Sequence, residues 1–218
     1  FKPNIVVCMP STVTNLEKRT ILDLVTAAGA GRACLIEEPL AAALGAGLDI
    51  RRPMGTMVVD IGGGTADIAV VTMGSISISK SVKIAGNILD EDIIRYLRRE
   101  RNIVIGEKTA ESIKKRIGCA YLRDTELAIG IKGKHYITGM PITDEVNTTE
   151  VYLAMREHLE AIAEGVRSVL EVTPPELAGD ISETGILLTG GGALLDGMDK
   201  QIEKRTGVHV IIPDDPLE

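Results

Sequence analysis

The sequence predicts an α/β fold with a small inserted α+β subdomain, and three observations support this prediction. The chain opens with an apolar strand, an amphipathic helix and a second short strand. Two strands rich in Val and Ile then flank a run of three glycines, which is typical of a hairpin. Near its end, a strand, a glycine loop, a helix and a strand follow one another, so strands and helices alternate there as well.

The first part of the chain is expected to contain two strand and helix pairs. Residues 5–9 form the first apolar run, and Thr14 followed by Glu17 has the spacing of a capping box that begins a helix. The run 33–36 predicts the second strand. Pro39 then stands at the favoured first position of a helix made of small residues.

The middle and the end of the chain divide into predicted elements at glycines, prolines and caps. A long helix begins at Asn147, which forms a second capping box with Glu150, and ends at the pair Pro174-Pro175. The other predicted elements are loop 49–55, strands 56–61, 66–73 and 76–84, a helix through 89–97, a short helix over 106–117, brief strands between 125 and 146, strand 186–188, helix 193–205 and strand 208–212.

Composition excludes several classes of function. Hydrophobic residues make up 44% and charged residues 25% of the 218 residues, which indicates a packed globular chain. The net charge of −7 and the absence of Trp argue against nucleic acid as a partner. No apolar run approaches the length of a membrane span. The three cysteines have no CxxC spacing, so we expect reduced thiols in the core of a cytoplasmic protein.

The glycine turn between the two Val/Ile strands is the first candidate site. Gly62, Gly63 and Gly64 leave their backbone N–H groups free of side-chain cover, so these groups can converge on phosphate oxygens. Asp60 stands where a Mg²⁺ shell needs an oxygen ligand, directly or through water, and Thr65 adds a hydroxyl. A simple hairpin needs fewer glycines, which favours phosphate binding.

A second glycine loop supports the same interpretation. Residues 189–194 follow an apolar strand and precede a predicted helix, a common place for a nucleotide. Neither GxxxxGK[ST] nor GxGxxG is present, so the P-loop and Rossmann folds are excluded by their own signatures. The two loops together indicate a ligand held from two sides.

These motifs resemble the actin, Hsp70 and sugar-kinase superfamily, and within it the MreB family of bacterial actins. The resemblance spans nearly the whole chain, and its runs are LIEEPLAAA (35–43), VVDIGGGT (58–65), IGEKTAE (105–111), TPPEL (173–177) and LTGGGALL (188–195). It implies the actin-like ATPase, or ribonuclease H-like, fold, with a mixed sheet flanked by helices. Ala66 and Asn87 depart from the family, which often has Thr and Asp there.

The resemblance also implies roles for individual residues. Glu38 would orient the attacking water with Thr65 beside it, although Glu37 stays open as the alternative. Asp60 would hold Mg²⁺ through water. The expected contacts to ATP or ADP are Gly62, Gly63, Gly64 and Thr65 at the phosphates and Glu111, Lys114, Gly190, Gly191, Gly192, Ala193 and Leu194 at the nucleoside. An exposed ion pair between Glu111 and Lys114 is the plain structural alternative.

The same resemblance divides the chain into parts of two lobes. Residues 1–48 would be a remnant of the first lobe (IA) with the connecting helix, residues 49–87 and 148–218 the core of the second lobe (IIA), and residues 88–147 an inserted subdomain (IIB). The family's first phosphate loop and last helix have no counterpart here, so we expect a fragment that is inactive alone, taken from a slow ATPase.

The expected function is an ATP-binding cytoskeletal protein whose subunits form filaments. By resemblance, it would direct cell shape by organising cell-wall synthesis, with ATP hydrolysis regulating assembly. Its partners would be its own copies, cell-wall elongation proteins and membrane-associated proteins, with membrane contact only through the missing part of the first lobe. A sugar-kinase-type phosphotransferase and a scaffold that binds nucleotide without hydrolysis are the alternatives, and the preference between ATP and GTP stays open.

Overall fold

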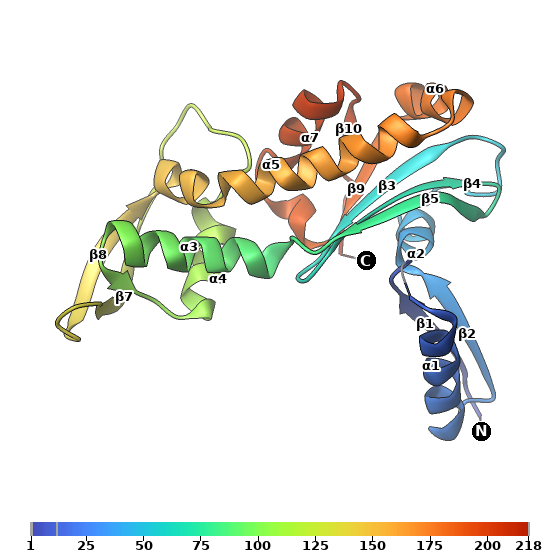
Figure 1. Cartoon of the computed structure of the whole chain (residues 1–218), viewed down its shortest axis with the longest axis horizontal. Helices are drawn as coiled ribbons and strands as arrows, with labels where there is room; N and C mark the ends of the chain where they lie inside the picture. Colours follow the sequence, from blue (N-terminus) through green and yellow to red (C-terminus); the bar gives the residue numbers. More distant parts are fainter. Residues whose placement is uncertain (1, 12, 218) are drawn as a thin grey trace.

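The computed structural model describes residues 2–11 and 13–217 and arranges them around three sheets (Figure 1). The largest has five strands in the order β10-β9-β3-β4-β5. Its strands are β3 (Thr56–Ile61), β4 (Ala66–Thr72), β5 (Ser75–Val82), β9 (Ile186–Thr189) and β10 (Val210–Ile211). Since β3, β4 and β5 pair antiparallel while β3, β9 and β10 pair parallel, the predicted mixed sheet is confirmed.

Helices cover both faces of this sheet because successive side chains of a strand point to opposite faces. Val59 joins the main core, which lies under α5 (Thr148–Val172), whereas the neighbouring Val58 belongs to a smaller cluster with Ala43 of α2 (Glu38–Gly45). A Cβ on Gly165 would come 2.9 Å from Val82 Cγ2, so α5 approaches the sheet closely at a residue that has no side chain. The two predicted capping boxes are confirmed at α5 and at α1 (Asn15–Ala27).

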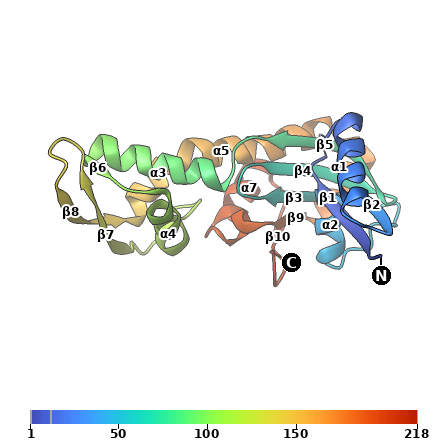
Figure 2. The same cartoon turned by 90° about the horizontal axis from the view of Figure 1, so that it is seen from below.

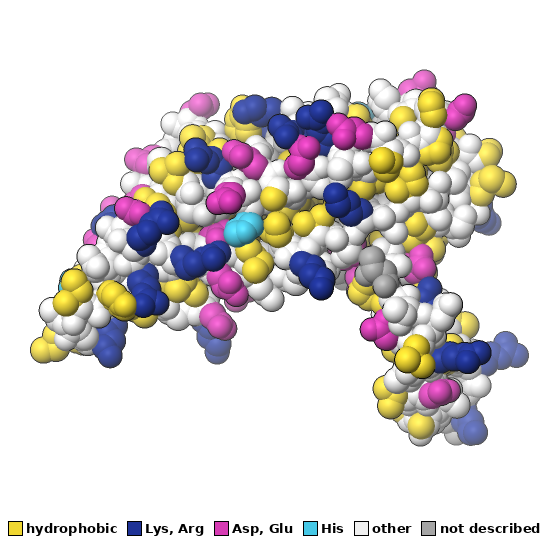
Figure 3. All heavy atoms as spheres, in the orientation of Figure 1, with side chains coloured by type: hydrophobic (Ala, Val, Ile, Leu, Met, Phe, Trp, Pro, Cys, Tyr) yellow, Lys and Arg dark blue, Asp and Glu magenta, His cyan; other side chains and the backbone are white. Residues whose placement is uncertain are grey.

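Two arms extend from the central sheet toward the same side. One arm holds the parallel pair β1 (Asn4–Met9) and β2 (Arg32–Glu37), with α1 along it. The other holds α3 (Gly86–Glu100), α4 (Glu107–Ile117), β6 (Ile103–Val104), β7 (Ala128–His135) and β8 (Pro141–Asn147). The surface is hollowed between the two arms (Figure 3), and Figure 2 shows β9 and β10 of the central sheet between them.

Three expectations are wrong in detail. The predicted helix 193–205 is a short 3-10 turn (Gly191–Leu194) followed by α7 (Met198–Thr206), because Gly197 between them has a φ of 74°. A helix that was not expected, α6 (Pro175–Thr184), begins at the second proline of the pair. Of the three cysteines only Cys119 is buried, while Cys8 and Cys34 are exposed on the uncovered face of the β1–β2 pair.

None of the described helices, α5 included, combines the length and the apolarity that crossing a membrane requires.

Candidate functional site

Three acidic or hydroxyl side chains lie in one row at an edge of the central sheet. The register places Asp60 of β3 directly opposite Asp67 of β4 and beside Thr189 of β9. Because β3 and β9 run parallel, both end at this edge, and the two glycine loops leave the sheet here. The carboxyl edge of parallel strands is where open α/β sheets bind their ligands.

The first glycine turn offers unused hydrogen-bond donors. Gly62 N donates to Thr65 O at 2.9 Å, which closes the turn. Within the described part of the chain, no acceptor binds the backbone N–H groups of Gly63, Gly64 and Thr65. Apart from Gly64 and the residues next to it, no described atom lies within 4 Å of the place where a Cβ on Gly64 would stand. The turn can therefore receive an anion at its open side.

The other side of this turn is held by the start of α3. Gly86 N donates to Gly62 O at 3.1 Å, and Asn87 N donates to Gly63 O at 2.8 Å. These contacts satisfy two of the N–H groups that the first turn of a helix leaves without an intrahelical partner. The carbonyl groups of the turn thus face α3, and its free N–H groups remain available to a ligand.

Thr65 is oriented by Asp67, a residue for which the sequence motifs predict no role. Its hydroxyl donates to Asp67 Oδ2 at 2.7 Å. Asp67 is 2% exposed, and its Oδ1 is buried with no hydrogen-bond partner among the described residues. The sequence carries one signal for Asp67, a single carboxylate within the mostly apolar run of β4. The structure buries almost all of this strand, and a buried charge needs a partner.

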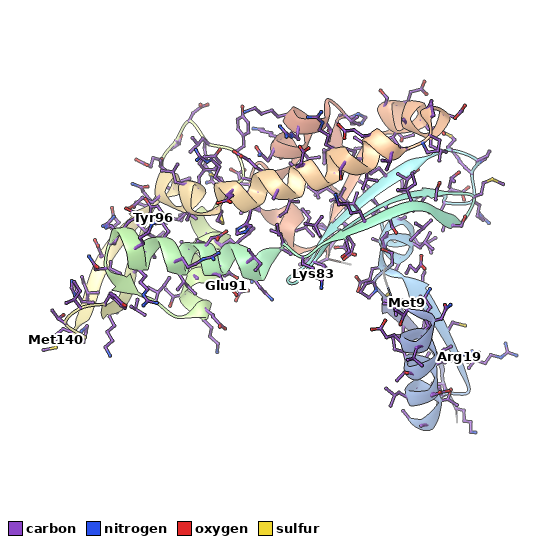
Figure 4. All side chains as sticks on the ribbon, viewed as in Figure 1. Met9, Arg19, Lys83, Glu91, Tyr96 and Met140 are labelled. Atoms are coloured by element: carbon purple, nitrogen blue, oxygen red, sulfur yellow. The ribbon has the colours of Figure 1, made fainter. Side chains whose placement is uncertain are left out.

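Glu38 reaches the same edge from the first residue of α2. Burial raises the pKa of the Glu38 carboxyl, and the nearby charges of Asp67 and Asp60 raise that pKa further. Burial likewise raises the pKa of Asp60, with a further contribution from Asp67. A cavity of about 300 Å³ is lined by Glu38, Asp60 and Gly190 together with part of α2 and the segment 213–217. Figure 4 shows Lys83 next to the end of the central sheet and Met9 on the arm that holds β1.

The structure separates the two candidate glutamates. Glu37 Oε1 lies 3.4 Å from Lys18 Nζ, in an ion pair with α1. Glu38 lines the cavity and lies within electrostatic range of Asp60 and Asp67. Glu38 is therefore the acid that faces the candidate site.

The acidic residues do not form a complete metal cage. In the described ranges, no group of three or more His, Cys, Asp or Glu side chains is placed to hold a metal ion. The buried, unpaired Oδ1 of Asp67 and the neighbouring carboxylate of Asp60 nevertheless fit a cation. Mg²⁺ in particular binds through one or two carboxylates, substrate phosphates and water, and does not need a cage made of protein alone.

The second glycine loop lies tightly against the end of β3. Gly190 has a φ of 78°, and a Cβ there would overlap Asp60 Oδ1. A Cβ on Gly192 would overlap the Ile61 side chain. Ala193 is buried, and Leu194 is 61% exposed. Only Gly191 has open space, with Leu217 Cδ2 at 4.0 Å as its nearest neighbour.

Glu111 and Lys114 lie on α4, outside the cavity that Glu38 and Asp60 line. They do not pair with each other, so the structural alternative of a Glu111 to Lys114 ion pair is wrong. Glu111 pairs with Lys115 at 2.6 Å, and Lys114 Nζ lies 2.8 Å from Asp90 Oδ2 and 2.7 Å from Gly86 O. The segment after α4 contacts the residues that follow the second loop, since Ala120 N donates to Asp196 O at 2.7 Å.

Comparison with known proteins identifies the family. The family model described as MreB/Mbl protein matches residues 1–218. The cell shape-determining protein MreB of Escherichia coli K12 is 46% identical over 215 residues, which cover 99% of this chain and 62% of that protein. The cell shape-determining protein Mbl of Bacillus subtilis 168 is 42% identical over 217 residues, covering 100% and 65%. The chain thus spans 62% to 65% of the length of these relatives.

Solved structures agree with this assignment. MreB 5 of Spiroplasma citri bound to AMPPNP superposes with a TM-score of 0.93 at 40% identity, over 97% of this chain and 64% of that one. A double helical filament of MamK gives a TM-score of 0.76 at 21% identity, over 99% and 65%, and so shares the fold. The predicted actin-like fold is confirmed, and the chain belongs to the MreB/Mbl family.

Proposed function

We propose that this chain is the nucleotide-binding part of an actin-like cytoskeletal protein whose subunits assemble into filaments. The observation that carries the proposal is the sheet edge at which free N–H groups of a glycine turn stand beside Glu38, Asp60 and Asp67. The names and bound nucleotides of relatives support it. Two relatives are called cell shape-determining proteins, and MreB5 of Spiroplasma citri was solved with AMPPNP and with ADP.

The turn is proposed to bind the β- and γ-phosphates of ATP. The N–H groups of Gly63, Gly64 and Thr65 point to no protein acceptor among the described residues, and phosphate oxygens would fill that need. Asp60, with Asp67 behind it, would hold Mg²⁺ through water, and the ion would offset the charge of the phosphates. Glu111 and Lys114 on α4 and the loop Gly190 to Leu194 would lie along the nucleoside.

Glu38 is proposed to prepare the attacking water. A carboxylate whose pKa is raised by burial and by neighbouring acids is a stronger base than an exposed one. It would accept a proton from water as the water oxygen bonds to the γ-phosphorus and the bond to the β-phosphate oxygen breaks, which gives ADP and phosphate. Thr65, fixed by Asp67, would help to place that water.

The activity of the whole protein is part of the proposal. Residues 1–48 would belong to the first lobe (IA), residues 49–87 and 148–218 to the second (IIA), and residues 88–147 to its insertion (IIB). Hydrolysis would act as a timer on lobe closure and subunit contacts, and the filaments would organise cell-wall synthesis in the cytoplasm near the membrane. The remaining length of the relatives would supply the other half of the phosphate clamp.

Two measurements on the full-length protein test the proposal. Sedimentation with Mg-ATP, Mg-ADP and Mg-AMPPNP should give pelletable filaments in at least one nucleotide state, and none in any state contradicts a cytoskeletal function. Phosphate release should fall about a hundredfold or more in Glu38→Gln, the typical contribution of a positioned base, and stay near wild type in the matched control Glu37→Gln. Unchanged release in Glu38→Gln would favour a site that binds nucleotide without using this acid.

A further inference from the structure

We infer that Lys114 is a positioning residue that holds the phosphate turn in place through the first turn of α3. The inference deepens the proposed function and rests on it, because it takes the turn at Gly62 to Gly64 as the phosphate site. It assigns Lys114 a role that a nucleoside contact would not include.

Four hydrogen bonds connect the lysine, the start of α3 and the turn. Lys114 Nζ donates to Gly86 O at 2.7 Å and to Asp90 Oδ2 at 2.8 Å. Gly86 in turn donates its N–H to Gly62 O at 3.1 Å, and Asn87 N donates to Gly63 O at 2.8 Å. Gly86 therefore connects the two, because its carbonyl oxygen accepts from the lysine and its N–H donates to the phosphate turn.

The close spacing at Gly86 shows that the contact is built into the packing. A Cβ on Gly86 would come 3.3 Å from Lys114 Nζ and 3.3 Å from Gly62 O, so a larger residue would be crowded on both sides. Two of the three N–H donors of the ammonium are used by Gly86 and Asp90. Most of the capacity of this lysine is thus committed inside the protein.

Asp90 provides the charge that keeps the lysine there. The Lys114 and Asp90 side chains are each 14% exposed, and Asp90 Oδ1 is buried without a partner in the described part of the chain. Burial raises the pKa of Asp90, which the hydrogen bond and the charge of Lys114 oppose. A half-buried pair of this kind is costly to break from one side, because the other charge is left without compensation.

The first test compares ligands with different numbers of phosphates. Affinities for adenosine, ADP and ATP are measured by calorimetry on the full-length protein and on Lys114→Met. Loss of the charge-assisted contact to Gly86 O, which leads to the turn, predicts about tenfold weaker ATP binding and less than about threefold weaker adenosine binding. An equal loss for all three ligands would show a nucleoside contact only, and it would overturn the inference. Lys108→Met removes an exposed lysine of α4 that has no ion pair among the described residues, and it should bind like wild type.

Asp90→Asn separates positioning from simple attraction between Lys114 and phosphate. If the lysine acts by holding α3 and the turn, loss of the Asp90 charge weakens its hold, and ATP binds more weakly. If the lysine acts only as a nearby positive charge, removal of the opposing carboxylate leaves ATP binding equal or tighter, which overturns the inference. The double variant Lys114→Met with Asp90→Asn carries no unpaired charge and should bind ATP no more tightly than Lys114→Met.

A measurement without nucleotide keeps this test independent of the proposed function. Amide hydrogen exchange at Gly86 and Asn87 should speed up in Lys114→Met and not in Lys108→Met, while protection of the central strands stays unchanged. Unchanged exchange at both amides would refute the positioning role even if ATP binds. If the wild-type protein binds no nucleotide while Lys114→Met still speeds up the exchange at Gly86 and Asn87, the phosphate site is refuted and the positioning role stands.

Discussion

The two glycine loops at the edge of the central sheet share the pattern Gly-Gly-Gly and differ in what surrounds them. The first, at 62–64, has free N–H groups and open space at Gly64. In the second, at 190–192, a Cβ on either outer glycine would overlap a residue of β3. The same Gly-Gly-Gly sequence therefore serves two purposes: it leaves room for a ligand in the first loop and allows close packing against β3 in the second.

This difference changes how the second loop is interpreted. The sequence pattern predicts ligand contacts in both loops, whereas the structure shows that Gly190 and Gly192 allow the second loop to pack closely against the end of β3. The second loop fixes the end of β3, and β3 leads directly into the first loop. Substitution in one loop should thus affect folding, and substitution in the other should affect binding.

The largest expected effect is that of Gly192→Ala on stability. The new methyl group would overlap the side chain of Ile61, which is 1% exposed and cannot move without disturbing the core. We expect the free energy of unfolding to fall by about 3 kcal/mol, at the upper end for overpacked sites. Chemical denaturation measures it. A loss below about 0.5 kcal/mol would show that the loop is not closely packed.

Gly64→Ala should have the opposite profile. Beyond the adjoining residues, none of the described atoms lies within 4 Å of the added methyl group, so the free energy of unfolding should stay within about 0.5 kcal/mol of wild type. The methyl group would stand where phosphate oxygens are proposed to approach the N–H groups, and ATP affinity should fall about tenfold or more. Calorimetry and denaturation on the same preparation test both parts, and unchanged affinity would contradict a phosphate site in this turn.

Asp60 is the residue that both loops share, and it connects stability to pH. Because burial and Asp67 raise the pKa of Asp60, the folded chain keeps this proton to higher pH than the unfolded chain does. Its contribution to stability is thus full below the unfolded pKa and is lost as pH rises through the folded pKa. Asp60→Asn should raise the free energy of unfolding at pH 7 by about 1 kcal/mol in a chelating buffer, while Mg-ATP binding weakens.

The pH profile checks the sign of this effect. The stability of Asp60→Asn should fall less than that of wild type as pH rises from the acid range to neutrality. Asp49→Asn is the opposite control, because the hydrogen bond and charge of Arg51 lower the pKa of Asp49. That variant should lose a contribution that is present at neutral pH and disappears as pH falls. Identical profiles for wild type and Asp60→Asn would show that Asp60 is not the destabilising acid.

Local signals in the sequence predict much of the fold. The capping boxes at Thr14 and Asn147 involve atoms three residues apart, and both form. The hairpin around the first glycine turn follows from two β-branched runs and their short connection. The prolines at 174 and 175 correctly predict the end of α5. They do not reveal that Pro175 also begins α6, although proline suits the first turn of a helix.

Tertiary contacts decide what the sequence leaves open. The choice of Glu38 over Glu37 depends on the ion pair of Glu37 with Lys18 and on the distance of α2 from Asp60 and Asp67. Lys114 pairs with Asp90, which lies 24 positions away in the sequence, and Glu111 pairs with the neighbouring Lys115 instead of Lys114. Neither spacing nor residue type within α4 distinguishes the two lysines, because their partners belong to the packing of the helices.

The smallest expected effect is that of Gly191→Ala, and it tests whether the second loop has a binding function besides its packing. Gly191 is the exposed middle residue, and Leu217 Cδ2 at 4.0 Å leaves space for a methyl group. Stability should therefore change by less than about 0.5 kcal/mol, unlike in Gly192→Ala. If the loop lies along the nucleoside, the methyl group should weaken adenosine, ADP and ATP equally and by only a few-fold, since it meets the part that all three share. A loss confined to ATP would instead place this loop at the phosphates, and a large loss of stability would show that the whole loop is as closely packed as its two outer glycines.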